Sequence, residues 1–334
     1  MRTGCHSHLG RWPAALAVAL AGFACAAPAA DLRLGIIGTD TSHAVALSQI
    51  FNDPKSKDRV PGGRVIAAFK GGSADNAYSA SRVEVFAAQI RTNSGVRLVD
   101  SIPALLDQVD AVLLLSVDGR PHLEQLRPVI AARKPVFVDK PMAASLADVV
   151  AMFRLAQDAR VPMFSASSLR FASNTLAARA GAVGTITNAA TASPCEIEPH
   201  HPDLFWYGVH GTESLFTVLG PGCVEVRRLT SATGKIEVQG RWRNGAKGVF
   251  REDPKYGGRA EGTKGAMTIG SFDGYAPLAR EIMKFFQNGV SPVPVEETLE
   301  IFAFMTAADE SKRLGGQPVN PAALLQATGW PPAR

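Results

Sequence analysis

Residues 31–47 read DLRLGIIGTDTSHAVAL, and this stretch decides the fold. An apolar strand over 32–37 runs into a glycine turn and then into a helix, which is how a nucleotide-binding βαβ unit opens. Gly35 and Gly38 stand where the first two glycines of a G-x-G-x-x-G turn belong, so both are candidate cofactor contacts, but Asp40 follows them. The pattern predicts a dinucleotide-binding fold with an incomplete phosphate turn.

The residues after Gly38 offer an alternative way to hold phosphate. Thr39, Thr41 and Ser42 carry hydroxyls that can donate hydrogen bonds at a helix N-terminus. Asp40 places a negative charge near the same position, which opposes phosphate binding. The competing interpretation is that Thr41 or Ser42 only caps the helix.

Strands and helices alternate through the first half of the chain. Strands are expected over 32–37, 64–69, 96–98, 111–116 and 135–138, and helices over 42–52, 81–91, 102–109, 122–132 and 146–158. Buried strands separated by helices predict a parallel sheet covered on both faces, with ligands at the carboxyl ends of its strands. We therefore expect a Rossmann-like domain over 31–160.

The pattern changes after Val161. Strands are expected over 185–192, 224–229, 235–243 and 266–270, and helices over 204–219, 276–288 and 295–314. This order predicts an α+β domain with a mostly antiparallel sheet over 161–334, which would carry the substrate and any oligomer contacts.

The first 30 residues have the pattern of a secretory signal peptide. Two arginines precede a short apolar run over 13–23, and Ala27 and Ala29 form an A-x-A cleavage pattern. The run is too short to span a bilayer. We expect an exported protein, periplasmic or secreted; a lipid anchor at Cys25 is the less favoured alternative.

Composition excludes several classes of partner. The formal net charge is +5, and two of the basic residues lie in the N-terminal segment, so the rest of the chain is too weakly basic to indicate nucleic acid or a membrane surface. No later stretch has the length of a membrane span. Cys195 and Cys223 remain after the N-terminal segment, and whether they pair or stay buried as thiols is left open.

The turn after the second strand bears on cofactor choice. An acid for the ribose hydroxyls is usual there, but this chain has Lys70 and Ser73, and no acid until Asp75. Lys70 and Ser73 suit a 2′-phosphate, so NADP is expected rather than NAD if a nicotinamide cofactor binds. A solvated turn without function is the alternative.

Two further strand ends supply candidate contacts. Ser116 ends the fourth strand, and residues 138–141, VDKP, follow the fifth. Asp139 and Lys140 thus lie at the edge of the sheet where ligands bind, with Lys140 held by a proline-stiffened turn.

Taken in order, these motifs resemble the Gfo/Idh/MocA family of glucose–fructose oxidoreductases and inositol dehydrogenases, in a divergent exported form. The matching pieces are GIIG (35–38) with His43 behind it, VDKP (138–141) in place of E-K-P, LRF (169–171), GVHGTESLFTVLG (208–220) and EETLEIFAFMTAADESKRLGG (296–316). The resemblance implies a nicotinamide-dependent oxidoreductase acting on a hydroxyl of a sugar or polyol. It makes His210 the general base and Lys140 the residue that holds the reacting oxygen.

One position departs from that family. An aspartate is common four residues before the histidine, and here the residue is Trp206. On a helix starting near Asp203, that residue, Trp206, His210 and Glu213 share one face, so Asp203 or Glu213 is expected to supply the carboxylate. We expect Lys140 and His210 to face one cleft between the domains. The alternative is that Trp206 packs at the domain interface and His210 is a buried, satisfied histidine.

A second class of function comes from residues 195–213, where imidazoles and carboxylates gather. Glu198, His200, His201 and His210 make a candidate zinc or manganese site, although no tight ligand spacing occurs and a chance polar loop is the favoured interpretation. A metal-assisted lyase or hydrolase acting on carbohydrate and a catalytically silent binding protein therefore stay open. The oligomeric state is open too, a homo-oligomer included.

Overall fold

The computed structural model describes residues 1–4, 30–232 and 234–331. Asp31–Arg334 forms one compact unit and Met1–Ala30 a separate one. The expected signal peptide therefore falls almost entirely outside the described residues. Within the described ranges, no helix combines the length and apolarity needed to cross a bilayer.

The first sheet has six strands, all parallel, in the order β3-β2-β1-β4-β5-β6. Its strands are β1 Leu32–Ile37, β2 Gly63–Phe69, β3 Arg97–Val99, β4 Ala111–Leu114, β5 Val136–Val138 and β6 Met163–Ser165. The first five were expected from the sequence. β6 carries the sheet past the expected domain boundary at residue 160. It was not expected from the sequence, because a strand of only three residues leaves little pattern.

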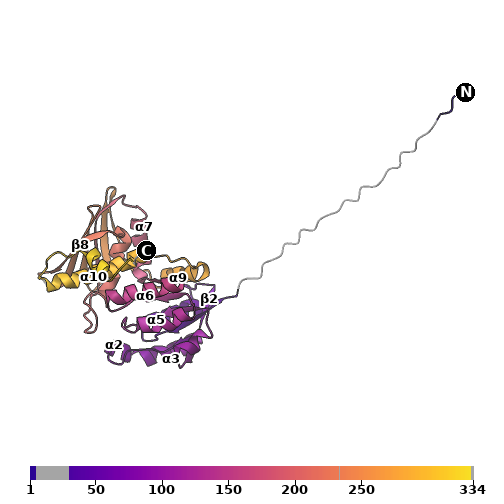
Figure 1. Cartoon of the computed structure of the whole chain (residues 1–334), viewed down its shortest axis with the longest axis horizontal. Helices are drawn as coiled ribbons and strands as arrows, with labels where there is room; N and C mark the ends of the chain where they lie inside the picture. The colour runs from indigo at the N-terminus through magenta and orange to yellow at the C-terminus, as the bar shows by residue number, and fades with distance from the viewer. Residues whose placement is uncertain (5–29, 233, 332–334) are drawn as a thin grey trace. The chain divides into compact units, whose positions relative to one another are not determined.

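Helices cover both faces of this sheet (Figure 1). α1 (Ser42–Asn52), α3 (Val83–Ser94) and α9 (Ala276–Asn288) pack their apolar side chains on one face. α4 (Ile102–Leu106), α5 (His122–Ala131) and α6 (Leu146–Ala159) cover the other. Because α9 comes from the second half of the chain, the two halves share a core. The short α2 (Ala77–Ala80) lies in the loop after β2.

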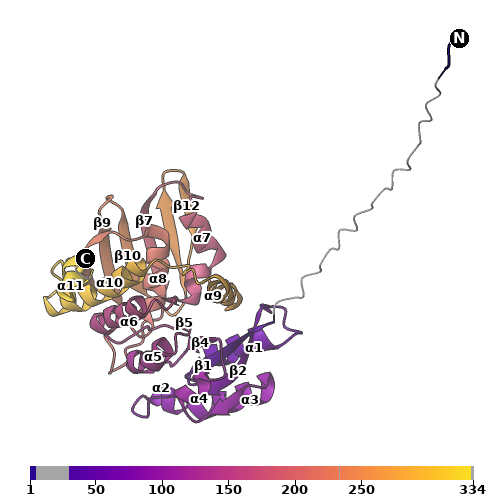
Figure 2. The same cartoon turned by 45° about the vertical axis from the view of Figure 1, so that its right-hand side comes forward.

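The second sheet has the order β12-β11-β7-β10-β9-β8 (Figure 2). Its strands are β7 Ile186–Ser193, β8 Cys223–Thr230, β9 Ile236–Trp242, β10 Lys247–Glu252, β11 Gly257–Gly262 and β12 Gly265–Thr268. All neighbours are antiparallel except β7 and β10. These two sheets confirm the expected α/β class with a mostly antiparallel second sheet.

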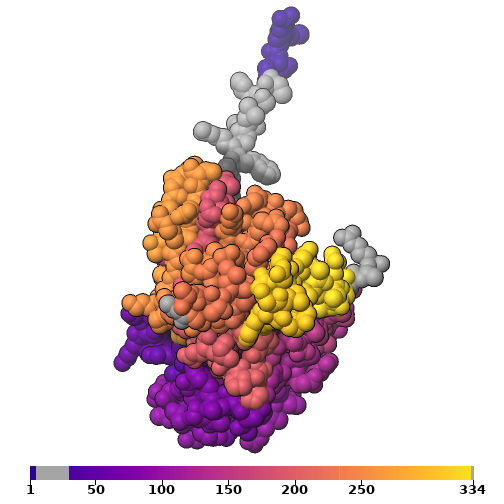
Figure 3. All heavy atoms as spheres, turned by 90° about the vertical axis from the view of Figure 1, so that its left-hand side faces the viewer, coloured from indigo at the N-terminus to yellow at the C-terminus, as the bar shows by residue number. Residues whose placement is uncertain are grey.

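Helices α8 (Gly208–Leu219) and α10 (Val295–Arg313) pack on the second sheet. α10 also contacts α6, so it joins the two halves, and α11 (Pro321–Ala327) packs beside it. In the space-filling view this yellow C-terminal region lies against the orange strands (Figure 3). The remaining helices, η1 (Ser168–Phe171) and α7 (Ser173–Arg179), connect β6 to β7.

Two of the departures from the expected elements concern α8 and the second sheet. The helix expected over 204–219 begins only at Gly208, and residues 203–207 form turns. Leu204, Phe205 and Trp206 are nonetheless buried, so apolar periodicity could not locate the helix start. β10 and β11 were not expected, because both contain glycine, which disfavours strands.

Candidate active site

The carboxyl ends of the parallel strands and the start of α8 enclose a cavity of about 110 Å³. Its wall is formed by Thr41, Ser42, His43, Tyr78, Val117, Lys140, Ser168, Leu169, Tyr207, His210, Tyr256, Phe272 and Tyr275. Larger hollows lie on the second sheet and beside α9, but they contain neither histidine nor a tyrosine. This cavity is therefore where acid–base chemistry can occur.

Lys140 and His210 both line the cavity, as the sequence predicts. Lys140 follows β5 and is 7% exposed, and its Nζ lies 5.1 Å from the centre of the Tyr207 ring. His210 lies in the first turn of α8 and is 5% exposed. Two residues 70 positions apart in the chain thus meet because β5 ends where α8 begins.

His210 is held by one nitrogen. Its Nδ1 lies 2.7 Å from Ser167 Oγ, at the end of β6. Burial, followed by the positive charges of Lys140 and His43, lowers the pKa of His210 well below its usual value. A neutral imidazole whose Nδ1 is occupied leaves Nε2 for a ligand in the cavity.

The chain contains four tyrosines, and all four line this cavity. Tyr78 comes from α2, and its hydroxyl lies 3.0 Å from that of Tyr207. Burial is the main cause that raises the pKa of Tyr256 and of Tyr275 to about 12; neighbouring tyrosines come next for Tyr256, and Asp139 comes next for Tyr275. These hydroxyls therefore stay protonated and can donate hydrogen bonds. The small number of tyrosines in the chain was the sequence signal that could have pointed to this cluster.

The phosphate turn begins later than the sequence suggested. Gly35 lies inside β1, where an added Cβ would meet Val109 and Leu105 at 3.0–3.1 Å, so it is packed against α4 and is not part of the turn. Gly38 is the first residue of the turn and has φ +93°. A Cβ added at this position would lie 2.2 Å from Ser116 N, so only glycine fits. In this register Asp40 and His43 occupy the second and third glycine positions of a G-x-G-x-x-G turn.

The side chain of Asp40 connects the turn to the segment that follows β4. Its carboxylate accepts hydrogen bonds from Val117 N at 3.1 Å and from Ser79 Oγ at 2.6 Å. Burial raises the pKa of Asp40, while these two hydrogen bonds act in the opposite direction. Thr39 is fully buried too, and its hydroxyl donates to the backbone oxygen of Val83.

The two remaining hydroxyls of the turn line the cavity. Thr41 caps α1, since its Oγ1 accepts from His43 N at 3.3 Å. Ser42 is exposed and hydrogen-bonds to Tyr275. The capping interpretation of Thr41 is thus correct, and neither hydroxyl is placed at a free phosphate position.

The other candidate cofactor contacts are also engaged. Lys70 Nζ pairs with Glu84 Oε1 at 2.7 Å on the surface, so Lys70 already has a carboxylate partner. Ser73 N donates to Ser79 Oγ at 2.8 Å, within the segment that carries α2. Ser116 Oγ donates to Gln125 Oε1 at 2.8 Å.

Asp139 pairs with His43, a contact that sequence reasoning missed. His43 Nδ1 lies 2.5 Å from Asp139 Oδ2, and both groups are buried. Burial acts to raise the pKa of Asp139, but His43 and then Lys140 outweigh it and hold that pKa below its usual range. The His43 ring lies 4.7 Å from the Tyr275 ring, so its position is fixed.

The expected carboxylate partner of His210 is not present in the cavity. Asp203 lies in the turns before α8, where it binds Arg228 at 3.0 Å and Lys312 at 2.7 Å. Glu213 is buried and pairs with Arg170 Nε at 2.5 Å. The expectation of a shared helical face was wrong, because α8 starts after Asp203 and Trp206. Trp206 instead packs on Tyr78, with ring centres 5.7 Å apart, as the domain-interface interpretation has it.

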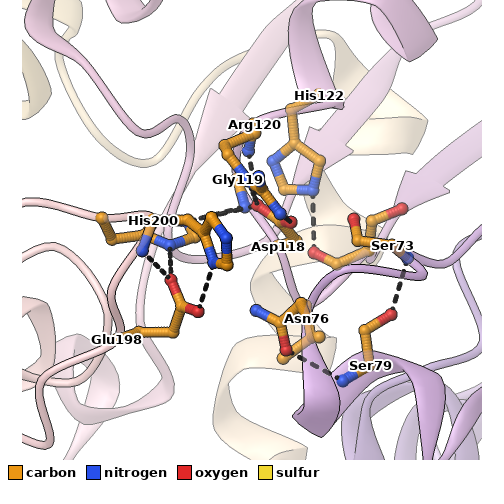
Figure 4. A network of polar contacts seen from close by, with 12 residues as sticks. Ser73, Asn76, Ser79, Asp118, Gly119, Arg120, His122, Glu198 and His200 are labelled. Atoms are coloured by element: carbon orange, nitrogen blue, oxygen red, sulfur yellow. Dashed lines mark hydrogen bonds and ion pairs between the residues drawn. The ribbon is translucent and has the colours of Figure 1, made fainter.

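The polar loop before α8 joins the two halves of the chain (Figure 4). Glu198 binds His200 and His201, each at 2.8 Å, and His201 Nε2 accepts from Gly119 N at 3.3 Å. Arg120 adds ion pairs to Asp118 and Asp75 within the first half.

This loop does not form the alternative metal site. His210 lies at Ser167, apart from Glu198, His200 and His201. Among residues 1–4, 30–232 and 234–331, no group of three or more His, Cys, Asp or Glu side chains is arranged to hold an ion. Cys195 and Cys223 are free, buried thiols, and burial raises the pKa of each to about 12.

The first half of the chain matches a known family model. Residues 32–167 match the Gfo/Idh/MocA family model, described as an oxidoreductase family with an NAD-binding Rossmann fold. The matched residues span β1 to β6, so the first sheet of this chain is similar to the Rossmann domain of that family. A comparison with curated protein sequences gave no match.

Solved structures share the fold over most of the chain. A probable dehydrogenase from Thermotoga maritima has a TM-score of 0.68 at 20% identity, covering 87% of this chain and 99% of its own. The apo scyllo-inositol dehydrogenase from Lactobacillus casei has a TM-score of 0.69 at 14% identity, covering 87% and 98%. An oxidoreductase from Agrobacterium radiobacter, in complex with NAD+, L-tartaric acid and magnesium, has a TM-score of 0.67 at 17% identity, covering 88% and 100%. At these identities the likeness shows the fold alone.

The residues present do not fit the dinucleotide that this fold implies. Pyrophosphate crosses such sheets between β1 and β4, where the strand order reverses. In this chain the Asp40 carboxylate bridges that crevice, and Thr39 and Asp40 are fully buried. No catalytic step is therefore assigned to a nicotinamide group.

Proposed function

We propose that this chain is an enzyme that performs acid–base chemistry at a hydroxyl-bearing carbon of a small sugar or polyol. The observation that carries the proposal is the shared cavity of Lys140 and His210, with all four tyrosines in its wall. The match of residues 32–167 to the Gfo/Idh/MocA family model supports an oxidoreductase ancestry for the site.

In this proposal His210 accepts the proton of a substrate hydroxyl. We assign the imidazole proton to Nδ1, which lies within hydrogen-bond distance of Ser167 Oγ, so that Nε2 is the unprotonated nitrogen offered to the substrate. Lys140 lies beside Tyr207 and supplies the positive charge that stabilises the developing oxyanion. Both groups are buried, so water screens this interaction weakly.

The cavity wall supports this choice of substrate class. Tyrosine rings present apolar faces to the C–H surfaces of a sugar or polyol, and their hydroxyls donate hydrogen bonds. A volume of about 110 Å³ admits a single small molecule and excludes an oligosaccharide. The substrate is therefore a free sugar, a cyclic polyol or a shorter hydroxylated compound.

Ligand binding tests this function. Inositols, hexoses and four-carbon polyols are titrated calorimetrically into the wild type and into Lys140→Met and His210→Asn. At least one compound should bind the wild type, and each variant should weaken that binding roughly tenfold or more. His200→Asn, a histidine outside the cavity wall, is the matched control. Binding that neither cavity variant changes would refute the proposal.

The turn after β2 supports a preference between the two nicotinamide cofactors. If the crevice is opened, we propose that NADP binds in preference to NAD, because Lys70 lies at the ribose end and can exchange Glu84 for a 2′-phosphate. Titration of Asp40→Gly with both nucleotides, with and without Lys70→Ala, tests this preference. Tighter binding of NAD would refute it.

We also propose that the protein is exported, on the signal-peptide pattern of residues 1–30. Expression of the full chain, followed by fractionation and N-terminal sequencing, should find the processed protein outside the cytoplasm. An unprocessed N-terminus in the cytoplasm would contradict export.

A further inference from the structure

Two positions that dinucleotide-binding turns reserve for glycine carry reactive side chains here. The second glycine of such a turn lets the backbone approach pyrophosphate, and the third lets the helix approach the strand. Asp40 and His43 stand at these positions, because the turn starts at Gly38 and α1 at Ser42. Both side chains are buried and both have partners, so neither is a loose surface substitution.

Asp40 and the segments around it close the crevice. The Asp40 carboxylate links the turn to the loop after β4 through Val117 N and to α2 through Ser79 Oγ. Tyr78, which belongs to α2, adds a contact to the second half of the chain: its hydroxyl lies 3.0 Å from the hydroxyl of Tyr207. The route that a pyrophosphate would take is thus occupied by a buried carboxyl group of the protein itself.

His43 brings a second acid–base group into the cavity. It lines the same cavity as His210 and Lys140. Asp139 binds Nδ1 of His43 at 2.5 Å; because an ionised carboxylate only accepts hydrogen bonds, Nδ1 carries the proton and Nε2 is left as the base. His210 has a serine in the corresponding place, so the two histidines have different partners.

We propose that this chain catalyses a redox-neutral proton transfer on a small α-hydroxycarbonyl compound, with His43 and His210 as the two bases and without a dinucleotide. The inference rests on the acid–base site of the proposed function and names its reaction. His43 removes the proton from the carbon that bears the hydroxyl. The C–H electron pair forms the carbon–carbon double bond of an enediolate, and the carbonyl π pair moves to oxygen, beside Lys140.

The second half of the reaction returns both protons. His210 carries the hydroxyl proton to the former carbonyl oxygen, and His43 gives its proton to the neighbouring carbon. The product is the isomeric hydroxycarbonyl compound. No electrons enter or leave, so the reaction needs no oxidant or reductant. Its chemistry, an aldose–ketose isomerisation, suits a cavity that holds one small molecule.

Deuterium exchange tests the proposal directly. The purified wild type is incubated in heavy water with dihydroxyacetone, glyceraldehyde or erythrulose, without added nucleotide, and carbon-bound deuterium is followed by proton NMR. Exchange should exceed the protein-free rate and fall roughly 100-fold in His43→Asn and His210→Asn. Asp139→Asn, a positioning change, should lower the rate and shift its pH profile. His200→Asn should exchange like the wild type, and circular dichroism checks that each variant is folded.

Nucleotide binding supplies the second measurement. NAD and NADP should not bind the wild type in calorimetry at concentrations up to about 1 mM, whereas Asp40→Gly should gain binding to one of them. Micromolar nucleotide binding by the wild type would overturn the proposal, as would exchange that persists in His43→Asn or exchange absent with all three probes. If sugar or polyol binding still depends on Lys140 while exchange is absent, this inference fails and the proposed function stands. Loss of both would reject both.

Discussion

At the scale of single residues, the partners of a side chain decide what it can do. His210 and His43 line the same cavity, but one is tied to a serine and the other to a carboxylate. Glu213 was a candidate for the carboxylate partner of His210, but in the structure it pairs with Arg170. The residue types were readable in the sequence, whereas their pairing was not.

The depressed pKa of His210 predicts an acid-sensitive contribution to stability. The folded state disfavours the imidazolium and the unfolded state does not, so acidification below pH 6.5 favours unfolding. His210→Asn should therefore lose roughly 1 kcal/mol less stability than the wild type between pH 6.5 and 5.5. Urea unfolding at several pH values measures this, and His200→Asn should keep the wild-type slope.

The two cysteines should be inert in the folded protein. Burial raises the pKa of Cys195 and Cys223 to about 12, so almost no thiolate exists at pH 8. A thiol reagent such as DTNB should label neither residue in the native protein and both in denaturant. Rapid labelling without denaturant would contradict this prediction.

At the scale of elements, α8 shows how packing sets a helix. It has no capping side chain at Tyr207, and it carries Gly208 and Gly211 where it approaches Cys195 and Phe250. These glycines bring the helix close to the second sheet and so place His210 at the cavity.

Replacing Gly211 should test that close approach. An added Cβ would lie 2.6 Å from Phe250 Cε2, so Gly211→Ala should destabilise the protein by about 1–3 kcal/mol although alanine favours helices. Gly257→Ala is the control, because its added Cβ meets nothing within 4 Å. Thermal unfolding of both variants decides the matter; equal melting temperatures would show that α8 can shift.

On α10, Asp309 should destabilise the folded protein at neutral pH. Burial and then the nearby Asp203 raise its pKa to about 6, so the native state favours its protonated form. Its favourable contribution is complete below the unfolded value of 3.8 and is lost as pH rises through about 6. Asp309→Asn should gain on the order of 1–2 kcal/mol at pH 7.5 and nothing at pH 4. Equal gains at both pH values would exclude this cause.

At the scale of the whole molecule, a buried ionic network ties η1, α8 and α10 together. Arg170 pairs with Glu213 at 2.5 Å and with Glu297 at 2.8 Å, and all three are at least nine-tenths buried. Arg179 reaches Glu297 at 2.9 Å from the exposed side. The network connects the end of the parallel sheet to the helices that cover the second sheet.

Breaking this network at its centre should cost far more than breaking it at its edge. Arg170→Met leaves two buried carboxylates without their shared cation, so we expect a loss of about 3–5 kcal/mol. Arg179→Met removes a partly exposed partner, and we expect a loss of about 1 kcal/mol or less. Chemical unfolding compares the two, and similar losses would show that the Arg170 pairs add little.

The sequence by itself determined the architecture. Apolar strands alternating with helices from Leu32 to Ala159 fixed the parallel sheet, because strand and helix periods are local properties of the chain. The buried strand before Lys140 placed that residue at the ligand-binding edge of the sheet, since strand ends of a parallel sheet meet at one edge, whereas His210 was named through the family resemblance; both line the cavity.

Only the tertiary structure decided which side chains work together. The pairs His43–Asp139, Arg170–Glu213 and Asp40–Val117 join residues 96, 43 and 77 positions apart. No local pattern encodes such pairings, because they depend on loop paths and on which neighbour satisfies each buried charge. The closed crevice is likewise a property of the folded chain. In the sequence, Asp40 is only a departure from the glycine motif, whereas in the structure its hydrogen bonds close the crevice between β1 and β4.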